Sequence, residues 1–254
     1  MSSILAGVEA PRIVLTGASG GIGLALLEAC LRRWPKARIE ALARRPEDCP
    51  RLIELAAAEG ERLRLHRFEL RDAEGLARLG AALAAEGPVQ LLIHATGLLH
   101  GPGIAPERTI AELTPEALAL AFAVNASGPA LLTRALLPAL RGRHPAVVAV
   151  LSAKVGSIGD NRLGGWYAHR AAKAALNQLF RCLAIELRRL NPESCVLLLH
   201  PGTVATRLSA PFAGGMNPRL APEEAATRLL ERILAASPAD TGSFLAPDGS
   251  ALPW

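Results

Sequence analysis

The sequence predicts an α/β fold, a doubly wound parallel sheet of about seven strands with helices on both faces. Strand-like and helix-like segments alternate along the whole chain, which is the pattern of parallel strands joined by helical crossovers. Several strand-like segments, such as residues 147–151, are apolar at every position, as expected when helices cover both faces of a sheet. A glycine-rich turn between the first strand and the first helix completes the pattern.

The alternation defines each element in chain order. The expected strands are Ile13–Thr16, Arg38–Ala43, Leu63–Leu70, Val89–Ala95, Ala146–Ala153, Cys195–His200 and Ser243–Ala246. The expected helices between them are Ile22–Trp34, Cys49–Ala58, Ala73–Glu86, Pro115–Leu140, Tyr167–Leu190 and Pro222–Ala236. Right-handed crossovers predict the strand order 3-2-1-4-5-6-7. No linker-like segment divides the chain, so residues 1–254 are expected to form a single domain.

The turn after the first strand, Thr16–Gly23, reads TGASGGIG. Glycines let a backbone turn tightly and let an anion approach, and the following helix offers unpaired N–H groups and a positive dipole end. These features favour a Rossmann-type site for a dinucleotide pyrophosphate. The spacing G-x-x-x-G-x-G departs from the commoner G-x-G-x-x-G, so a glycine-rich turn without a ligand stays an alternative.

The end of the second strand indicates which dinucleotide is preferred. An NAD site usually places a carboxylate about 20 residues after the glycines, where it binds the ribose 2′-hydroxyl. Here that position is Ala43, followed by Arg44 and Arg45. Two guanidinium groups can bind a 2′-phosphate, so the sequence favours NADP(H). Solvated cations at a strand end are the alternative interpretation.

Composition excludes several other classes of protein. The net charge is +5, but the arginines are scattered and aromatic residues make up 4% of the chain, which argues against nucleic-acid binding. No signal peptide is recognisable, and no uninterrupted run of about 18 apolar residues predicts a membrane span. Cys30, Cys49, Cys182 and Cys195 lack the spacing of a metal or redox site. We therefore expect a cytoplasmic protein with free thiols and no metal.

Four motifs in order give a more specific indication: TGASGGIG, HATG at 94–97, Asn125 in a long helix, and PGTVAT at 201–206. Together they resemble the short-chain dehydrogenase/reductase family across essentially the whole chain. The segments LSAKVGSIGDNRLGGWY, LHPGTVATRLSAPF and GSFLAPDGSALPW are most similar to its C-factor-like branch, which includes carbonyl reductases. The resemblance implies a nicotinamide cofactor, a small-molecule carbonyl or alcohol substrate and an Asn-Ser-Tyr-Lys catalytic set. It also implies a substrate loop at about residues 203–221, carrying Leu208, Pro211, Phe212 and Met216.

The cofactor positions of the family carry over well. Gly17, Ser19, Gly21, Ile22 and Gly23 match the pyrophosphate turn. Glu69 and Leu70 stand where the family has Asp-Val beside the adenine. Residues 94–97, with Ala95, Thr96 and Gly97 after His94, replace the family's Asn-Asn-Ala-Gly. Pro201, Gly202, Val204 and Thr206 match the loop that holds the nicotinamide carboxamide, and Lys173 matches the lysine that binds the nicotinamide ribose.

The catalytic positions carry over only in part. In the family a tyrosine lies four residues before the lysine, so that both share one face of a helix. Here His169 lies four residues before Lys173, and Ala153, with Ser152 beside it, takes the serine position. The candidate catalytic residues are therefore Asn125, Ser152, His169, Lys173 and Tyr167.

Tyr167 is the only tyrosine, but it precedes Lys173 by six residues, about 240° around a helix. It can occupy the usual tyrosine site only if the helix begins later or shifts register, and we otherwise expect it to be a pocket-wall residue. His169 has the required spacing, and the neighbouring ammonium favours its neutral form, which can still donate a hydrogen bond to a carbonyl oxygen. Lys173 is one of three lysines beside 25 arginines, which suggests that an ammonium is needed there.

Two functions stay open at this point. The first is an NADP(H)-dependent oxidoreductase acting on a carbonyl/alcohol pair, in which His169 works in an atypical active site. The second is an NADP(H)-binding protein with little or no turnover, a sensor or interaction partner in which His169 is a relic. Helices 115–140 and 167–190 carry more apolar residues than one buried face needs, so we expect a homodimer or homotetramer.

Overall fold

Seven parallel strands form one sheet in the order β3-β2-β1-β4-β5-β6-β7, as the sequence predicts. The computed structural model describes residues 3–101, 103–215 and 219–254, so Met216 of the predicted substrate loop lies outside the described residues. The strands are β1 (Arg12–Thr16), β2 (Arg38–Ala43), β3 (Leu63–Arg67), β4 (Leu91–His94), β5 (Ala146–Leu151), β6 (Ser194–Leu199) and β7 (Ser243–Leu245). Strands β1, β4, β5 and β6 are buried along their whole length, because helices cover both faces of the sheet.

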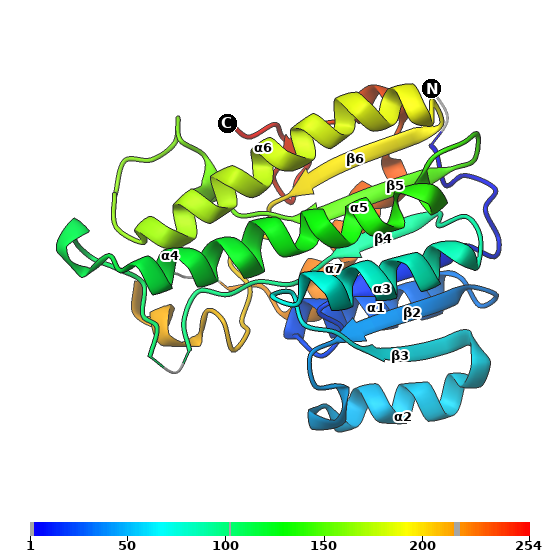
Figure 1. Cartoon of the computed structure of the whole chain (residues 1–254), viewed down its shortest axis with the longest axis horizontal. Helices are drawn as coiled ribbons and strands as arrows, with labels where there is room; N and C mark the ends of the chain where they lie inside the picture. The colour runs from blue at the N-terminus through cyan, green and yellow to red at the C-terminus, as the bar shows by residue number, and fades with distance from the viewer. Residues whose placement is uncertain (1–2, 102, 216–218) are drawn as a thin grey trace.

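Helices form a layer on each side of the sheet (Figure 1). The helices are α1 (Gly21–Arg33), α2 (Pro50–Glu59), α3 (Ala73–Ala85), α4 (Pro115–Phe122), α5 (Gly128–Leu140), α6 (Tyr167–Leu190) and α7 (Pro222–Ala235). Helices α1 and α7 pack side by side on one face, while α3, α5 and α6 cover the other. Helix α2 adjoins the edge strand β3, and α4 extends the line of α5 toward the start of α6.

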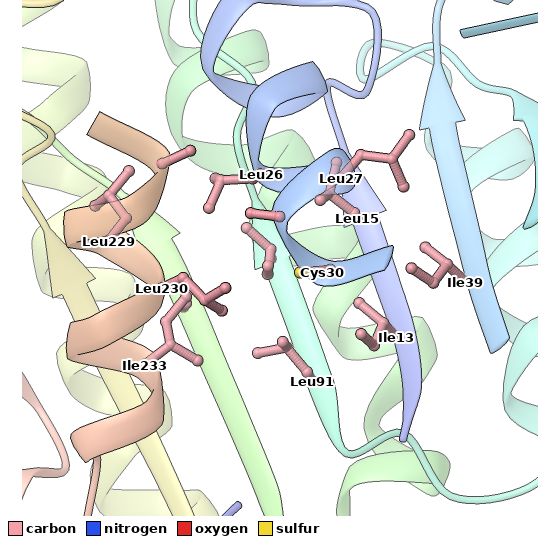
Figure 2. Close-up of a cluster of buried hydrophobic side chains, with 14 of the residues drawn as sticks. Ile13, Leu15, Leu26, Leu27, Cys30, Ile39, Leu91, Leu229, Leu230 and Ile233 are labelled. Carbon is pink, nitrogen blue, oxygen red and sulfur yellow. The ribbon is translucent and has the colours of Figure 1, made fainter. Parts of the chain in front are cut away.

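The two cores follow from the two-residue period of the strands. In β1, Ile13 and Leu15 face α1 and α7, whereas Val14 faces the layer of α3, α5 and α6. Figure 2 shows the first of these cores, in which side chains of α1 and α7 meet those of the sheet. Its labelled residues are Ile13, Leu15, Leu26, Leu27, Cys30, Ile39, Leu91, Leu229, Leu230 and Ile233. This packing fixes the height of α1 above β1, and so the position of the glycine turn between them.

Three expected strands are shorter in the structure. The strand expected over 63–70 ends at Arg67, because Glu69 and Asp72 form a turn and the Asp72 side chain then accepts from Gly75 N at the start of α3. The strand expected over 89–95 is shorter, Leu91–His94, and the one expected over 146–153 ends at Leu151. The other strands agree with expectation to within about two residues, and so do the helices apart from the one expected over Pro115–Leu140.

The helix expected over Pro115–Leu140 is interrupted by a π-helical turn, Ala123–Ser127. Pro129 has no N–H to donate to the preceding turn, which disrupts the regular ladder there. Gly128 also lies close to Leu70, since a β-carbon on it would be 2.8 Å from the Leu70 Cβ. The turn places Asn125 on the buried side of the helix, where it is 1% exposed.

One helical stretch in the described part of the chain, Pro115–Leu140, is long and apolar enough to cross a membrane by length and composition. Its most apolar window has a mean hydropathy of 1.3 and is 44% buried. Leu132, Leu136 and Leu140 of this stretch are fully buried in the core shared with the sheet, which accounts for its composition. The absence of a membrane span stays a prediction.

Candidate active site

The loops that follow the strands gather at the carboxyl edge of the sheet, on the left of Figure 1. The glycine turn at this edge has room only for glycine at three positions. Gly17 has φ +78°, and a β-carbon on it would lie 2.8 Å from the carbonyl oxygen of Ala95. A β-carbon on Gly23 would lie 2.1 Å from the carbonyl oxygen of Gly17, and one on Gly21 would lie 2.9 Å from Cγ2 of Thr206. The turn is therefore a tight, bare-backbone surface.

The residues of this turn fit a dinucleotide pyrophosphate. Helix α1 begins at Gly21 with no side chain capping its first turn and no acidic residue in it, so its N-terminal N–H groups and positive dipole end are available to an anion. Ser19 and Ile22 are half-buried beside the turn, and Ala95 and Thr96 face Gly17 from the end of β4. Gly97 is exposed and lies near Asn125 and Leu208. The Thr96 hydroxyl is buried without a hydrogen-bond partner among the described residues, as expected of a group that binds a ligand.

The end of β2 offers one free guanidinium. Arg44 is exposed and has no ion-pair partner in the described part of the chain, whereas Arg45 Nε lies 2.9 Å from Asp48 Oδ2. The two predicted phosphate ligands are thus not equivalent, and Arg44 is the one with free donors. Glu69, on the neighbouring loop, pairs with Arg71 at 3.4 Å, and Leu70 is buried against Gly128.

The loop after β6 closes over the glycine turn. Val204 is buried and pairs with Leu220 in an isolated parallel bridge, and Thr206 touches the Gly21 position. Pro201 and Gly202 are half-buried, and Gly202 takes a left-handed conformation with φ +81°. This arrangement brings all four predicted carboxamide-loop residues to the same edge as the glycine turn.

The loop after β4 is held by two predicted catalytic residues that bind the backbone of the same residue, Leu98. The Asn125 side chain accepts from Leu98 N and donates to Leu98 O, both at 2.9 Å. His169 Nδ1 donates to the same Leu98 oxygen, also at 2.9 Å. We call this arrangement the Leu98 bracket. It joins the π-helical turn, the β4 loop and α6, and it uses every polar atom of the Asn125 side chain, which makes Asn125 a positioning residue here.

His169 and Lys173 lie one turn apart on the buried face of α6. Burial, with a smaller contribution from the Lys173 ammonium, lowers the pKa of His169 to about 4, so its ring is neutral at pH 7. Burial lowers the pKa of Lys173 to about 8, and its Nζ donates to Leu151 O at 2.9 Å. The Lys173 stem packs against Gly156, where a β-carbon would lie 2.8 Å from the Lys173 Cβ.

Ser152 lies beside this pair, but its hydroxyl points into the core. It donates to Asn177 Oδ1 at 2.6 Å, and the residue is 3% exposed. The expectation that Ser152 could replace the missing serine is therefore corrected, because side chains of successive extended residues point to opposite sides. Ala153 is the residue on the other side of the chain, and it carries no hydroxyl.

Tyr167 is the first residue of α6 and is half-buried. Its hydroxyl has no hydrogen-bond partner among the residues that the structure describes. The helix includes Tyr167, His169 and Lys173 in one register, so the angular separation expected from the sequence holds and Tyr167 does not share the face of Lys173.

Several site residues had no recognisable signal in the sequence. Trp166 takes a left-handed conformation with φ +53° and packs edge-on to His169 and against Phe212. His100 Nε2 lies 3.1 Å from the carbonyl oxygens of both Arg207 and Leu208, which ties the β4 loop to the substrate loop. The pair Gly164-Gly165 before Trp166, both with positive φ, was the one available sign of a special turn.

Glu107 was also missed, although it is 4% exposed. Its carboxylate accepts from Ala168 N, which satisfies an otherwise unpaired donor in the first turn of α6. Together with Leu98 and His169 it lines a pocket of about 20 Å³, room for about one water molecule. Glu107 therefore fixes the start of the helix that carries His169.

His94, which replaces an asparagine of the family pattern, belongs to the core. Its ring nitrogens lie 2.8 Å from Thr133 Oγ1 and 3.4 Å from Thr16 Oγ1, and its ring meets Phe180 edge-on. Burial lowers the pKa of His94 to about 3. In the described residues no cluster of three or more His, Cys, Asp or Glu could hold a metal ion.

The chain resembles known proteins over most of its length. A family model described as short chain dehydrogenase matches residues 11–215. The chain is 34% identical over 178 residues to C-signal of Myxococcus xanthus, which covers 70% of this chain and 99% of that protein. It is 32% identical over 181 residues to 1-hydroxy-2-glutathionyl-2-methyl-3-butene dehydrogenase of Rhodococcus sp. (strain AD45), covering 71% of this chain and 76% of the relative.

A solved carbonyl reductase of Pseudomonas aeruginosa PAO1, in complex with NADP, superposes with a TM-score of 0.80 at 33% identity and covers 96% of this chain and 100% of that one. The fold, the glycine turn and these matches agree with the resemblance found in the sequence. The chain belongs to the short-chain dehydrogenase/reductase family.

Proposed function

We propose that this chain is an NADP(H)-dependent oxidoreductase that acts on the carbonyl/alcohol pair of a small molecule, with His169 as its acid–base group. The observation that carries the proposal is the position of His169 and Lys173, buried one turn apart on α6 and joined to Asn125 through the Leu98 bracket. Buried titratable groups with shifted pKa values cluster at functional sites, and an ammonium and an imidazole buried side by side on one helix fit that pattern.

The residues assigned to the cofactor follow from the fit of the site. Gly17, Gly21 and Gly23 would cradle the pyrophosphate, Arg44 would bind the 2′-phosphate, and Lys173 would bind the nicotinamide ribose. The cofactor, when bound, would exchange hydride with the substrate carbon. NADP in the Pseudomonas relative supports this choice, as does the absence of a carboxylate at the end of β2.

Lys173 has a second role in this proposal. Burial is the main reason that the imidazole of His169 stays neutral at pH 7, and the Lys173 ammonium adds to it by disfavouring a second positive charge nearby. Its one bond to Leu151 O leaves donors for a ribose hydroxyl.

A second candidate is an NADP(H)-binding protein without turnover, which would act as a sensor or interaction partner. The observation that favours it is the position of Ser152, which is bonded to Asn177, together with the lack of a hydroxyl on Ala153. A substrate oxygen would then have one fixed partner fewer than in the family pattern.

Paired measurements separate the two candidates. Calorimetric titration with NADPH and NADH gives the cofactor affinity, and a panel of alcohols, aldehydes, ketones and quinones tests turnover in both directions. If the chain is an oxidoreductase, we expect turnover, and His169→Phe should abolish it while NADPH affinity stays nearly unchanged. Tight NADPH binding with no turnover across the panel would favour the sensor.

We also propose a cytoplasmic homodimer or homotetramer. Support for an interface comes from exposed apolar side chains on the long helices, among them Leu179 at 42% and Ile185 at 55% exposure. Sedimentation at micromolar concentration tests the oligomer, and a monomer would contradict it.

A further inference from the structure

The bond between His169 and Leu98 fixes which nitrogen of the ring carries the proton. Nδ1 lies 2.9 Å from a backbone carbonyl oxygen, which can only accept a hydrogen bond. Nδ1 must therefore be the N–H of the ring. The other tautomer would set the Nδ1 lone pair against the carbonyl oxygen.

The carbonyl oxygen cannot turn away to relieve such a contact. Asn125 accepts from Leu98 N and donates to Leu98 O at 2.9 Å each, so both sides of the residue are held. The Asn125 side chain is itself 1% exposed and sits in the π-helical turn. The Leu98 bracket is thus a rigid acceptor that selects one tautomer of His169.

Nε2 is then an acceptor only. The ring is neutral, because burial and the Lys173 ammonium both disfavour the imidazolium. Nε2 has no hydrogen-bond partner among the described residues, and it is not one of the fully buried unpaired atoms, so it reaches open space. A bare lone pair on the face of α6 shared with Lys173 is therefore available to a ligand.

We infer that His169 presents a proton acceptor to the substrate. The resting site therefore recognises a hydroxyl group, and its substrate class is an alcohol, which binds without prior protonation of the His169 ring. This inference rests on the proposed oxidoreductase function and adds the polarity of its acid–base group. A carbonyl oxygen has no proton to offer and would face the Nε2 lone pair.

The oxidation step balances with one base and one hydride acceptor. The alcohol O–H bond breaks and its proton goes to Nε2, which makes the ring an imidazolium. The C–H bond of the same carbon breaks, and the hydride leaves with its electron pair to an oxidised nicotinamide dinucleotide. The alcohol is oxidised to a carbonyl compound and the dinucleotide is reduced. The imidazolium, disfavoured by burial and by Lys173, then returns its proton to water.

The pH dependence of kcat/KM expected for His169 is opposite to that expected for a phenol. Neutral His169 predominates above about pH 4, and Lys173, whose pKa is about 8, stays charged up to about pH 7, so kcat/KM for alcohol oxidation should be flat between about pH 5.5 and pH 7. Carbonyl reduction needs the imidazolium, so its kcat/KM should fall tenfold for each unit of rising pH over that range. A phenol with a pKa above this range gives the reverse, a flat reduction rate and an oxidation rate that rises with pH.

The first experiment reads the tautomer without turnover. Long-range ¹H–¹⁵N NMR of the full chain labelled with ¹⁵N-histidine, without cofactor and again with NADP⁺, distinguishes Nδ1–H from Nε2–H rings, and the spectrum of His169→Phe identifies the signal of His169. We expect the Nδ1–H tautomer between pH 6 and 8, with no imidazolium. An Nε2–H tautomer or a charged ring would overturn the inference.

The second experiment compares the pH profiles of the wild type and His169→Tyr in both directions. The wild type should show flat oxidation and falling reduction, and His169→Tyr should show flat reduction and rising oxidation. A phenol-like profile in the wild type would overturn the inference and leave the oxidoreductase function in place. If no alcohol or carbonyl turned over, the oxidoreductase function and the proton transfer would both fail, while the NMR spectrum would still decide whether Nε2 is an acceptor.

Discussion

Ser152 donates its hydroxyl to Asn177 Oδ1 at 2.6 Å, inside the core between β5 and α6. Both residues are at most 3% exposed, and the Asn177 amide nitrogen has no partner of its own among the described residues. This bond is therefore the one that pairs a polar atom of the buried Asn177 side chain. Asn177 lies one turn beyond Lys173 on the same face of α6. The bond stabilises the site. Because the Ser152 hydroxyl points to Asn177, it is not directed toward a substrate oxygen.

Ser152→Ala should accordingly lower the free energy of unfolding by about 1–3 kcal/mol, because it leaves the Asn177 oxygen buried and unpaired. NADPH affinity should change less than twofold. Urea unfolding and calorimetric titration measure the two effects, and Ala153→Ser, on the other side of the chain, is the matched control that should leave stability nearly unchanged. A loss of cofactor affinity with unchanged stability would contradict this assignment.

The sheet order and the cofactor edge could be predicted from the sequence because they depend on strong local signals. Continuous apolar strands, alternation with amphipathic helices, and a glycine-rich turn between the first strand and the first helix are each visible in the residues themselves. The replacement of the family's tyrosine by His169 was equally visible, because residues four apart on a helix share one face.

The Leu98 bracket could not be predicted, because its three residues are separated by 27 and 71 positions and meet through backbone atoms that any residue at 98 would supply. The direction of Ser152 was missed for a similar reason. One residue of offset at the end of β5 decides whether a hydroxyl faces the core or the site.

Cofactor preference should depend on Arg44 more than on Arg45, because Asp48 already pairs with Arg45. NADPH should bind at least tenfold more tightly than NADH, about 1.4 kcal/mol. Arg44→Asp should reduce or invert this ratio, while Arg45→Ala should reduce it less. Titration of each variant with both cofactors measures the ratio, and equal affinities in the wild type would contradict the assignment of the 2′-phosphate site.

The glycine turn should tolerate no side chain at Gly23, where a β-carbon would lie 2.1 Å from the Gly17 carbonyl oxygen. Gly23→Ala should shift the turn and weaken NADPH binding at least tenfold. Gly101→Ala is the control, since a β-carbon there would meet nothing within 4 Å and Gly101 has no positive φ. Similar NADPH affinities for the two variants would show that the turn does not hold the cofactor.

The buried ring of His94 should make the protein sensitive to acid. Its folded pKa of about 3 lies below the ordinary 6.5, so the unfolded chain takes up the proton first as the pH falls. Stability is lost between about pH 6.5 and pH 3, and this ring should contribute a loss of about 2 kcal/mol between pH 7 and pH 5.

His94→Asn keeps a polar group near Thr133 but removes this titration. The variant should be less stable at pH 7, because it no longer fills the space against Phe180, yet its stability should fall less on going to pH 5. Urea unfolding at the two pH values measures the difference. An unchanged pH dependence would mean that the ring is already protonated or solvated in the folded protein.

His169→Tyr should raise carbonyl reductase activity, because a phenol is a proton donor where the neutral imidazole of the wild type presents only a lone pair at Nε2. Lys173, the Asn125 contacts to Leu98 and the glycine turn are already in place around it. The gain should be limited, since Ala153 still lacks the hydroxyl that the family pattern supplies to the substrate oxygen.

Adding Ala153→Ser to His169→Tyr should therefore increase kcat/KM for reduction by more than the product of the two single effects, as expected of groups that act on one oxygen. Ala153→Ser alone should do little, because the proton donor is still missing. Kinetics of the four proteins with one ketone at fixed pH complete the cycle, and NADPH affinity should be similar in all four. Strictly multiplicative effects, or a His169→Tyr variant less active in reduction than the wild type, would show that the position of His169 is not where the substrate oxygen lies.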